Sequence, residues 1–177
     1  RISELVKRVK ELGQDAVAIT DHGVMYGVID FYKACKAAGV KPIIGCEVYV
    51  AQRKRTDRVH ERDAESRHLV LLCKNETGYR NLSYMVSMGF LEGFYIKPRI
   101  DMELLRAHSE GLIALSACLA GEIPRLLRNG DYEGAKAHAL EMQELFGEDS
   151  YYLELQDHGL PEQKQIVAGI LRLHEET

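Results

Sequence analysis

An imidazole, a carboxylate and a thiol lie at or near the ends of three separate apolar runs in this chain of 177 residues. His22 follows the run AVAIT, Glu47 lies inside IIGCEVYV just past a glycine, and Cys118 follows LIALSA. In parallel α/β folds, functional groups collect where strands end and loops begin, so we expect these side chains at one edge of a sheet. Together they are suitable ligands for a borderline metal ion such as zinc.

Each of the three residues also has an ordinary structural explanation. A cysteine after a strand is usually a small core residue. His22 could donate a hydrogen bond to a loop carbonyl, and Glu47 could cap a helix. The residues alone therefore do not decide between a metal site and these structural explanations. No rival functional motif is present, since the sequence contains no phosphate-binding glycine loop, dinucleotide motif or nucleophile elbow.

The composition is that of an ordinary globular domain. Apolar residues make up 46% of the chain and charged residues 28%, and no apolar run approaches the length of a membrane span. The net charge of −4 does not favour a freestanding duplex-binding module. The four cysteines lack C-x-x-C spacing, which indicates reduced thiols of a cytosolic protein rather than a disulfide framework or zinc ribbon.

Short apolar runs alternate with helical patterns along the chain. This alternation predicts an α/β fold with parallel strands, compatible with either a barrel or an open doubly wound sheet. Gly39 should end the second helix, Asp131 should cap a long helix, and Pro161 should open the last one. The predicted strands are 16–20, 43–50, 69–73, 112–117 and 151–155, and the predicted helices are 2–12, 28–39, 77–91, 122–129, 131–147 and one from 161 onward.

Residues 51–67 interrupt this alternation with six basic and four acidic residues. We expect a solvated, mobile loop, with the binding of a polyanion as the alternative. Arg80 and the stretch Lys97–Arg99 could also contact phosphates, although ordinary surface positions are the first expectation for them. Five further histidines lie in polar or helical contexts, and we expect most of them at the surface, least clearly His158 in QDHG; they are His60, His108, His138, His158 and His174.

Several longer strings resemble one family, and together they cover nearly the whole chain. They resemble the polymerase and histidinol phosphatase (PHP) domain, in the version that opens the alpha subunit of bacterial DNA polymerase III. TDHG is shared by many PHP proteins, whereas KPIIGCE, HLVLLCKN and YYLELQDHG are specific to the polymerase branch. The strings are ITDHGVMYGVIDFYKACKAAGVKPIIGCEVYVA (19–51), HLVLLCKNETGYRNL (68–82), GFYIKPRID (93–101), LSACLAGEIPRLL (115–127) and YYLELQDHGLPEQ (151–163).

The resemblance implies a distorted seven-stranded (β/α) barrel, similar to a TIM barrel, with up to three divalent metal ions at one mouth. Zinc is the first expectation, with manganese or magnesium as alternatives. The family ligands that match are His22, Glu47, His68 and Cys118. His68 is identified through the resemblance alone, because it precedes its predicted strand and parallel geometry would put it at the opposite edge.

The family pattern also includes an H-x-H motif and an aspartate before the first helix, and a D-x-H motif on a later strand. We expect these to fall outside this sequence, so that residues 1–177 are an incomplete PHP domain with five of its strands. A barrel without its flanking strands leaves open edges. The isolated chain is therefore expected to be inactive and poorly folded.

The resemblance implies a fragment of the cytoplasmic replicative polymerase, with DNA and other polymerase III holoenzyme subunits as partners and no membrane. DNA synthesis would belong to the parent chain, and the PHP domain would be a metal-dependent phosphoesterase, in some members a 3′–5′ exonuclease. Asp21 could orient His22 as a supporting carboxylate, with a solvated loop acid as the simpler expectation. The alternatives are a non-catalytic, metal-stabilised structural domain that binds partner subunits and a freestanding PHP phosphoesterase.

Overall fold

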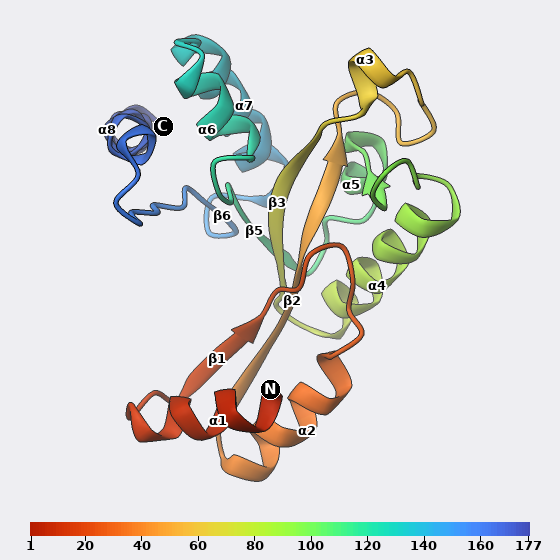
Figure 1. The fold of residues 1–177 in the computed structure, drawn as a ribbon, viewed down its shortest axis with the longest axis vertical. Coiled ribbons are helices and arrows are strands. Elements are labelled where there is room, and N and C mark those ends of the chain that lie inside the picture. Colours follow the sequence, from red (N-terminus) through yellow and green to blue (C-terminus); the bar gives the residue numbers. More distant parts are fainter.

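The structure is a computed structural model that describes all residues 1–177. Helices and strands alternate along most of the chain, which confirms the α/β class (Figure 1). The strands are β1 (Ala16–Ile19), β2 (Lys41–Ala51), β3 (Ser66–Cys73), β4 (Arg99–Ile100), β5 (Leu112–Leu115) and β6 (Tyr151–Tyr152). The helices are α1 (Ile2–Glu11), α2 (Val28–Ala38), α3 (His60–Asp63), α4 (Glu76–Leu91), α5 (Met102–Ala107), α6 (Glu122–Arg128), α7 (Tyr132–Phe146) and α8 (Pro161–Glu176).

The six strands form one open sheet in which the expectation of parallel strands is wrong at β3. The order is β1-β2-β3-β5-β6, with β4 paired to β2. The pairs β1–β2, β2–β4 and β5–β6 are parallel, whereas β3 is antiparallel to both β2 and β5. A parallel return requires a crossover, usually a helix. The connection from β2 to β3 contains only the four-residue helix α3, and the chain returns in the opposite direction.

Local signals place most helix ends where the sequence predicts them. The Asp131 carboxylate accepts a hydrogen bond from the Gly134 amide at 2.9 Å and caps α7. Gly39 ends α2 with a left-handed φ of 71°, and Pro161 opens α8. Three short elements, α3, β4 and α5, were not predicted, and β6 ends at Tyr152 rather than at residue 155. Elements of two to six residues are too short to show a hydrophobic period.

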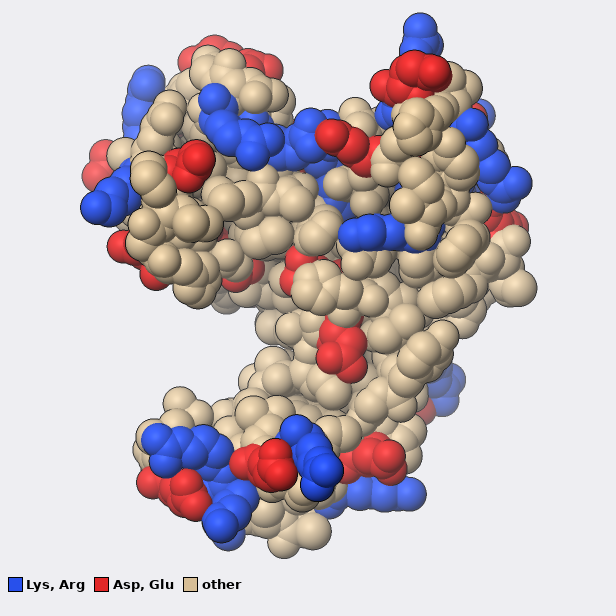
Figure 2. Space-filling model, in the orientation of Figure 1, with Lys and Arg blue, Asp and Glu red and all other residues tan.

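The two faces of β2 have different roles because successive side chains on a strand point in opposite directions. Cys46, Val48 and Val50 belong to a buried cluster with residues from α4, α5 and α7. Glu47 and Tyr49 therefore lie on the face turned away from this cluster. In Figure 1, α1 and α2 lie at one end of the sheet and α6 and α8 near the other, and Figure 2 shows a deep hollow between these two ends.

Most residues of the charged segment 51–67 are exposed, as expected of a solvated loop, but specific ion pairs attach the segment to the rest of the domain. Asp63 is 1% exposed and accepts hydrogen bonds from the Arg53 guanidinium. The Arg55 guanidinium binds Asp101 and Glu92. Arg99 is also 1% exposed, and its guanidinium donates to four backbone carbonyls, three of them in residues 55–63. A phosphate-binding role for Arg99 is excluded by this burial.

None of the helices in this chain combines the length and the apolar character that crossing a lipid bilayer requires.

Candidate metal centre

The loop after β1 brings His22 to the side of β2. The Glu47 amide donates to the Asp21 carbonyl at 3.0 Å, and the Gly23 amide donates to the Glu47 carbonyl at 2.9 Å. These two bonds extend the parallel pairing past the end of β1 and form a bridge between His22 and Glu47. The Asp21 side chain is exposed, and no hydrogen bond from it to His22 is present, which agrees with a solvated loop acid.

The antiparallel direction of β3 explains the position of His68. His68 lies opposite Tyr49 in the register between β2 and β3, and Val70 lies opposite Glu47. Directly opposed residues project from the same face of a sheet, so His68 shares the face of Glu47 and Tyr49. The amino end of β3 meets the carboxyl end of β2, and the expectation that His68 lies at the opposite edge is therefore wrong.

A strained turn after β5 carries Cys118. Ala117 has a φ of 62°, which is uncommon for a residue with a side chain. The Gly121 amide donates to the Cys118 carbonyl at 2.8 Å, and the His68 amide donates to the Ala120 carbonyl at 3.1 Å. These bonds attach the turn to β3 and bring the Cys118 thiol beside the His68 ring.

The four side chains meet in a compact group of ligand atoms. His68 Nδ1 lies 2.6 Å from Glu47 Oε1, and His22 Nε2 lies 3.4 Å from Glu47 Oε2. The ligand atoms of these three residues all lie within 4.8 Å of one another. Cys118 Sγ is 3.6 Å from His68 Nδ1 and 3.9 Å from Glu47 Oε1. Tertiary structure thus brings together the four residues that the sequence predicts as ligands.

The electrostatics of the group follow from these short distances. The Cys118 thiol and the Glu47 carboxylate raise the pKa of His68 to about 9. The hydrogen bond from His68 lowers the pKa of Glu47, and the same imidazole lowers the pKa of Cys118. The His68 ring therefore favours the charged forms of both Glu47 and Cys118.

The donor set fits a divalent metal ion. Two imidazoles, a carboxylate and a thiol with a lowered pKa supply nitrogen, oxygen and sulfur ligands, the types that zinc accepts. Glu47 and His68 are 14% and 15% exposed at their side chains, whereas the His22 side chain is 59% exposed. The group is consequently open to solvent on the side of His22.

Two further residues lie beside this group: Tyr49, which the sequence does not identify, and Lys97, which the sequence gives only as a possible phosphate contact. The Tyr49 ring lies edge-on to the His68 ring, with 5.1 Å between centroids, and stacks near His22 at 6.4 Å. Lys97 Nζ lies 4.3 Å from the centroid of the Tyr49 ring. The alternation of side chains along 43–50 could have placed Tyr49 beside Glu47, but no local signal relates Lys97 to this strand.

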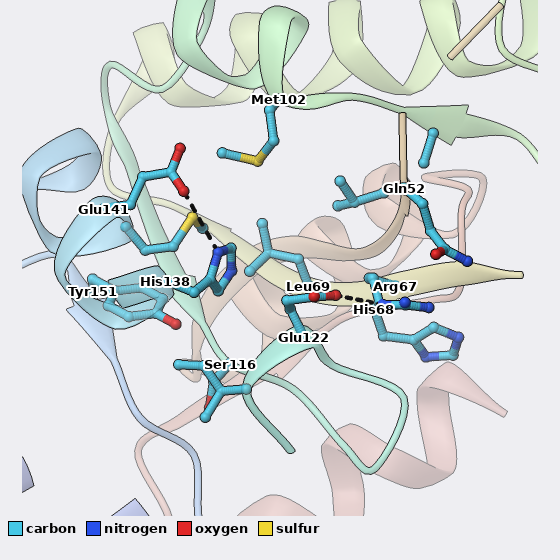
Figure 3. A pocket seen from close by; sticks show the side chains of 14 residues that line it. Gln52, Arg67, His68, Leu69, Met102, Ser116, Glu122, His138, Glu141 and Tyr151 are labelled. Carbon is cyan, nitrogen blue, oxygen red and sulfur yellow. Dashed lines mark hydrogen bonds and ion pairs between the residues drawn. The ribbon is translucent and has the colours of Figure 1, made fainter. Parts of the chain in front are cut away.

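A cavity of about 240 Å³ lies between the sheet and helices α5, α6 and α7 (Figure 3). His138 and Glu141 of α7 line it, and Arg67 forms an ion pair with Glu122 at its border. Burial lowers the pKa of His138, which is half-buried rather than a surface histidine. His68 also lines this cavity, together with its neighbours Arg67 and Leu69, so the cavity borders the candidate metal centre.

Comparison with known proteins defines the family. Residues 1–158 match the PHP domain. The chain therefore belongs to the PHP domain family. A crystal structure described as that of a metal-dependent phosphoesterase from Bifidobacterium adolescentis has the same fold, with a TM-score of 0.52 and 15% identity, covering 98% of this chain and 78% of that one.

The more similar relatives are much longer proteins. DNA polymerase III subunit alpha of Treponema pallidum is 50% identical over 173 residues, which cover 97% of this chain and 15% of the relative. The subunit of the same name from Thermus aquaticus is 48% identical over 170 residues, covering 94% of this chain and 14% of the relative. The chain thus spans about 15% of the length of these curated relatives.

Proposed function

We propose that this chain is the PHP domain of a bacterial DNA polymerase III alpha subunit and that His22, Glu47, His68 and Cys118 bind divalent metal for phosphodiester hydrolysis, as a 3′–5′ exonuclease. The ligand atoms of His22, Glu47 and His68, which lie within 4.8 Å of one another, carry the proposal, with Cys118 Sγ 3.6 Å from His68 Nδ1. High identity to polymerase subunits over nearly the whole chain supports the parent protein. DNA and other holoenzyme subunits would be its partners, in the cytoplasm.

The side chains of the cluster have separable roles in this proposal. Glu47 occupies the centre and faces His68 with one oxygen and His22 with the other. Its hydrogen bond with His68 fixes the orientation of that ring. The exposed His22 is the ligand nearest to solvent, so substrate would approach from its side. A bound divalent ion supplies an electrophile and a water of lowered pKa.

A non-catalytic, metal-stabilised structural domain is the second candidate, and one observation favours it. The four ligands come from four separate segments: the loop after β1, strand β2, strand β3 and the turn after β5. An ion bound by all four would connect these segments. Such a site could stabilise the polymerase and its contacts with partner subunits without turnover.

The test is metal content and nuclease activity of the full-length protein beside its His22→Ala and Cys118→Ala variants. Metal is measured by mass spectrometry, and hydrolysis is measured on single-stranded DNA labelled at the 5′ end. We expect both quantities to fall together in both variants. Loss of a ligand should cost at least the roughly 10–100-fold that loss of a supporting partner costs.

His158→Ala and Cys73→Ala are the matched controls, since they remove the same side chains at positions outside the cluster. Both should keep metal and activity. A protein that binds metal through His22 and Cys118 but never degrades DNA would establish the structural candidate. Metal content unaffected by either substitution would contradict the proposed site altogether.

A further inference from the structure

Lys97 is an exposed cation beside the candidate metal centre, and the four proposed ligands make no contact that accounts for its position. Its ammonium nitrogen lies 4.3 Å from the centroid of the Tyr49 ring, and that ring packs against both His68 and His22. No carboxylate lies within ion-pair distance of Lys97. The other basic candidates are already engaged: Arg80 pairs with Glu76, and Arg99 is buried among backbone carbonyls.

The backbone around Lys97 is built to hold it there. Arg99 pairs with Tyr49 in the register between β4 and β2, so backbone pairing attaches this segment to the strand of Glu47. The buried Arg99 side chain fixes the segment further by donating to backbone carbonyls of residues 55–63. The Tyr95 amide donates to the Lys97 carbonyl at 3.1 Å and closes a tight turn. Ile96, inside this turn, has a φ of 64° and is 57% exposed.

The conformation of Ile96 is unusual for a β-branched residue. Because the Ile96 side chain is exposed, it gains no burial energy that would offset the strain of this backbone conformation. Strained backbone is maintained where the surrounding structure imposes it, and such positions cluster at binding and catalytic sites. Here the consequence of the turn is that Lys97 projects over Tyr49, at the border of the metal centre.

We propose that Lys97 is a positioning residue that binds the phosphate of the substrate beside the metal centre, which rests on the proposed phosphodiester hydrolysis. A lysine ammonium is a flexible point charge with three donors and suits a phosphate oxygen. The Tyr49 ring holds the ammonium through a cation–π contact without neutralising it. The Lys97 ammonium, which no carboxylate pairs, is thus available to an anionic ligand that approaches from the exposed side of His22.

The experiment compares the full-length, metal-loaded wild type with its Lys97→Met and Lys97→Arg variants. KM and kcat are measured on single-stranded DNA, and the Kd for thymidine 5′-monophosphate is measured by calorimetry. We expect Lys97→Met to raise both KM and Kd about tenfold, with kcat within about twofold of wild type. The slope of log KM against log salt should fall by about 0.7. Lys97→Arg should retain both constants.

Lys36→Met is the matched control, because Lys36 also lies over a tyrosine ring, that of Tyr32, away from the metal centre. It should change neither constant. Unchanged KM and Kd in Lys97→Met would overturn the inference, as would a loss of metal content and kcat together, which indicates a structural role. A wild type that hydrolyses no DNA overturns the nuclease function, whereas the nucleotide titration decides the Lys97 site in either case.

Discussion

At the scale of single residues, Glu47 is the side chain on which the site depends. Its two oxygens face two different imidazoles, and its backbone amide and carbonyl both bond to the loop that carries His22. One residue on one strand thus orders ligands from two other segments. The short contact with His68 also accounts for the lowered pKa of Glu47.

Gly23 is the residue that allows this loop to approach the strand. Its φ is 69°, and a Cβ at this position would lie 2.8 Å from Tyr49 Cε2 and 3.1 Å from Pro98 Cγ. Both the backbone conformation and the space exclude an ordinary side chain. Any substitution must therefore move either the His22 loop or the Tyr49 ring.

We expect Gly23→Ala to lower both the unfolding temperature and the metal content of the full-length protein. Gly13→Ala is the control, since Gly13 has a φ of 71° but nothing within 4 Å of an added Cβ. The control isolates the backbone cost of roughly 1–2 kcal/mol. Calorimetry gives the unfolding temperatures and metal analysis gives the metal contents of both variants, and a larger loss in Gly23→Ala is the expected result. Equal effects of the two substitutions would show that the contacts of Gly23 with Tyr49 and Pro98 are unimportant.

At the scale of elements, α8 is held against α6 and α7 by an apolar cluster and an ion-pair group. Ile166, Ile170 and Leu173 of α8 pack in that cluster with residues of α6 and α7. Beside it, the Glu176 carboxylate accepts hydrogen bonds from Lys136 of α7 and Arg172 of α8, each at 2.8 Å. The Lys136 ammonium and the Arg172 guanidinium lower the pKa of Glu176 from 4.5 to about 2.

This lowered pKa predicts how the attachment of α8 depends on pH. A carboxylate with a depressed pKa contributes stability that is present above its ordinary pKa and is lost as pH falls through its folded value. We expect Glu176→Gln to speed amide exchange in α8 at pH 7. The difference from wild type should persist down to about pH 4.5 and disappear near pH 2.

Hydrogen-exchange mass spectrometry of the full-length protein, corrected for the intrinsic effect of pH, is the measurement for this attachment. Glu175→Gln changes an adjacent exposed carboxylate that forms no ion pair and should leave α8 unaffected. Equal exchange in wild type and Glu176→Gln at pH 7 would show that the apolar cluster alone holds α8.

At the scale of the whole molecule, the sheet has two free edges. β1 and β6 end the strand order, and the hollow in Figure 2 opens on the side that α4 and α5 do not cover. Large apolar side chains such as Leu12, Tyr26 and Ile29 are more than half exposed. Unpaired edges and exposed apolar surface are favourable sites for association with other chains or segments.

We therefore expect the isolated chain of 177 residues to bind a hydrophobic dye and to unfold over a broad temperature range. Its nuclease activity should be absent. Differential scanning calorimetry and dye fluorescence of the purified chain provide the measurement, with the full-length protein as the comparison. A sharp, cooperative transition without dye binding would contradict this expectation and would show that the open sheet is stable by itself.

The sequence by itself determined the features that depend on neighbouring residues. The alternation of apolar runs predicted the α/β class, and Asp131 and Gly39 predicted helix ends. Strand-end positions predicted that His22, Glu47 and Cys118 lie together, and both His22 and Cys118 lie beside Glu47. These signals can be read from a single sequence because helix capping and strand burial depend on residues that are close together in the chain. His68 was identified as a ligand only through the resemblance to the PHP domain, and the sequence offered no physical reason for its position.

Only the tertiary structure decided the features that depend on the direction in which strands pair. The antiparallel β3 places His68 on the face of Glu47, a result that the apolar run 69–73 cannot encode, because buried strands of either direction have similar sequences. The same holds for Lys97, which lies over Tyr49 because β4, only two residues long, pairs with β2. Register between distant segments is a property of the whole sheet, and the residues of one strand do not specify it.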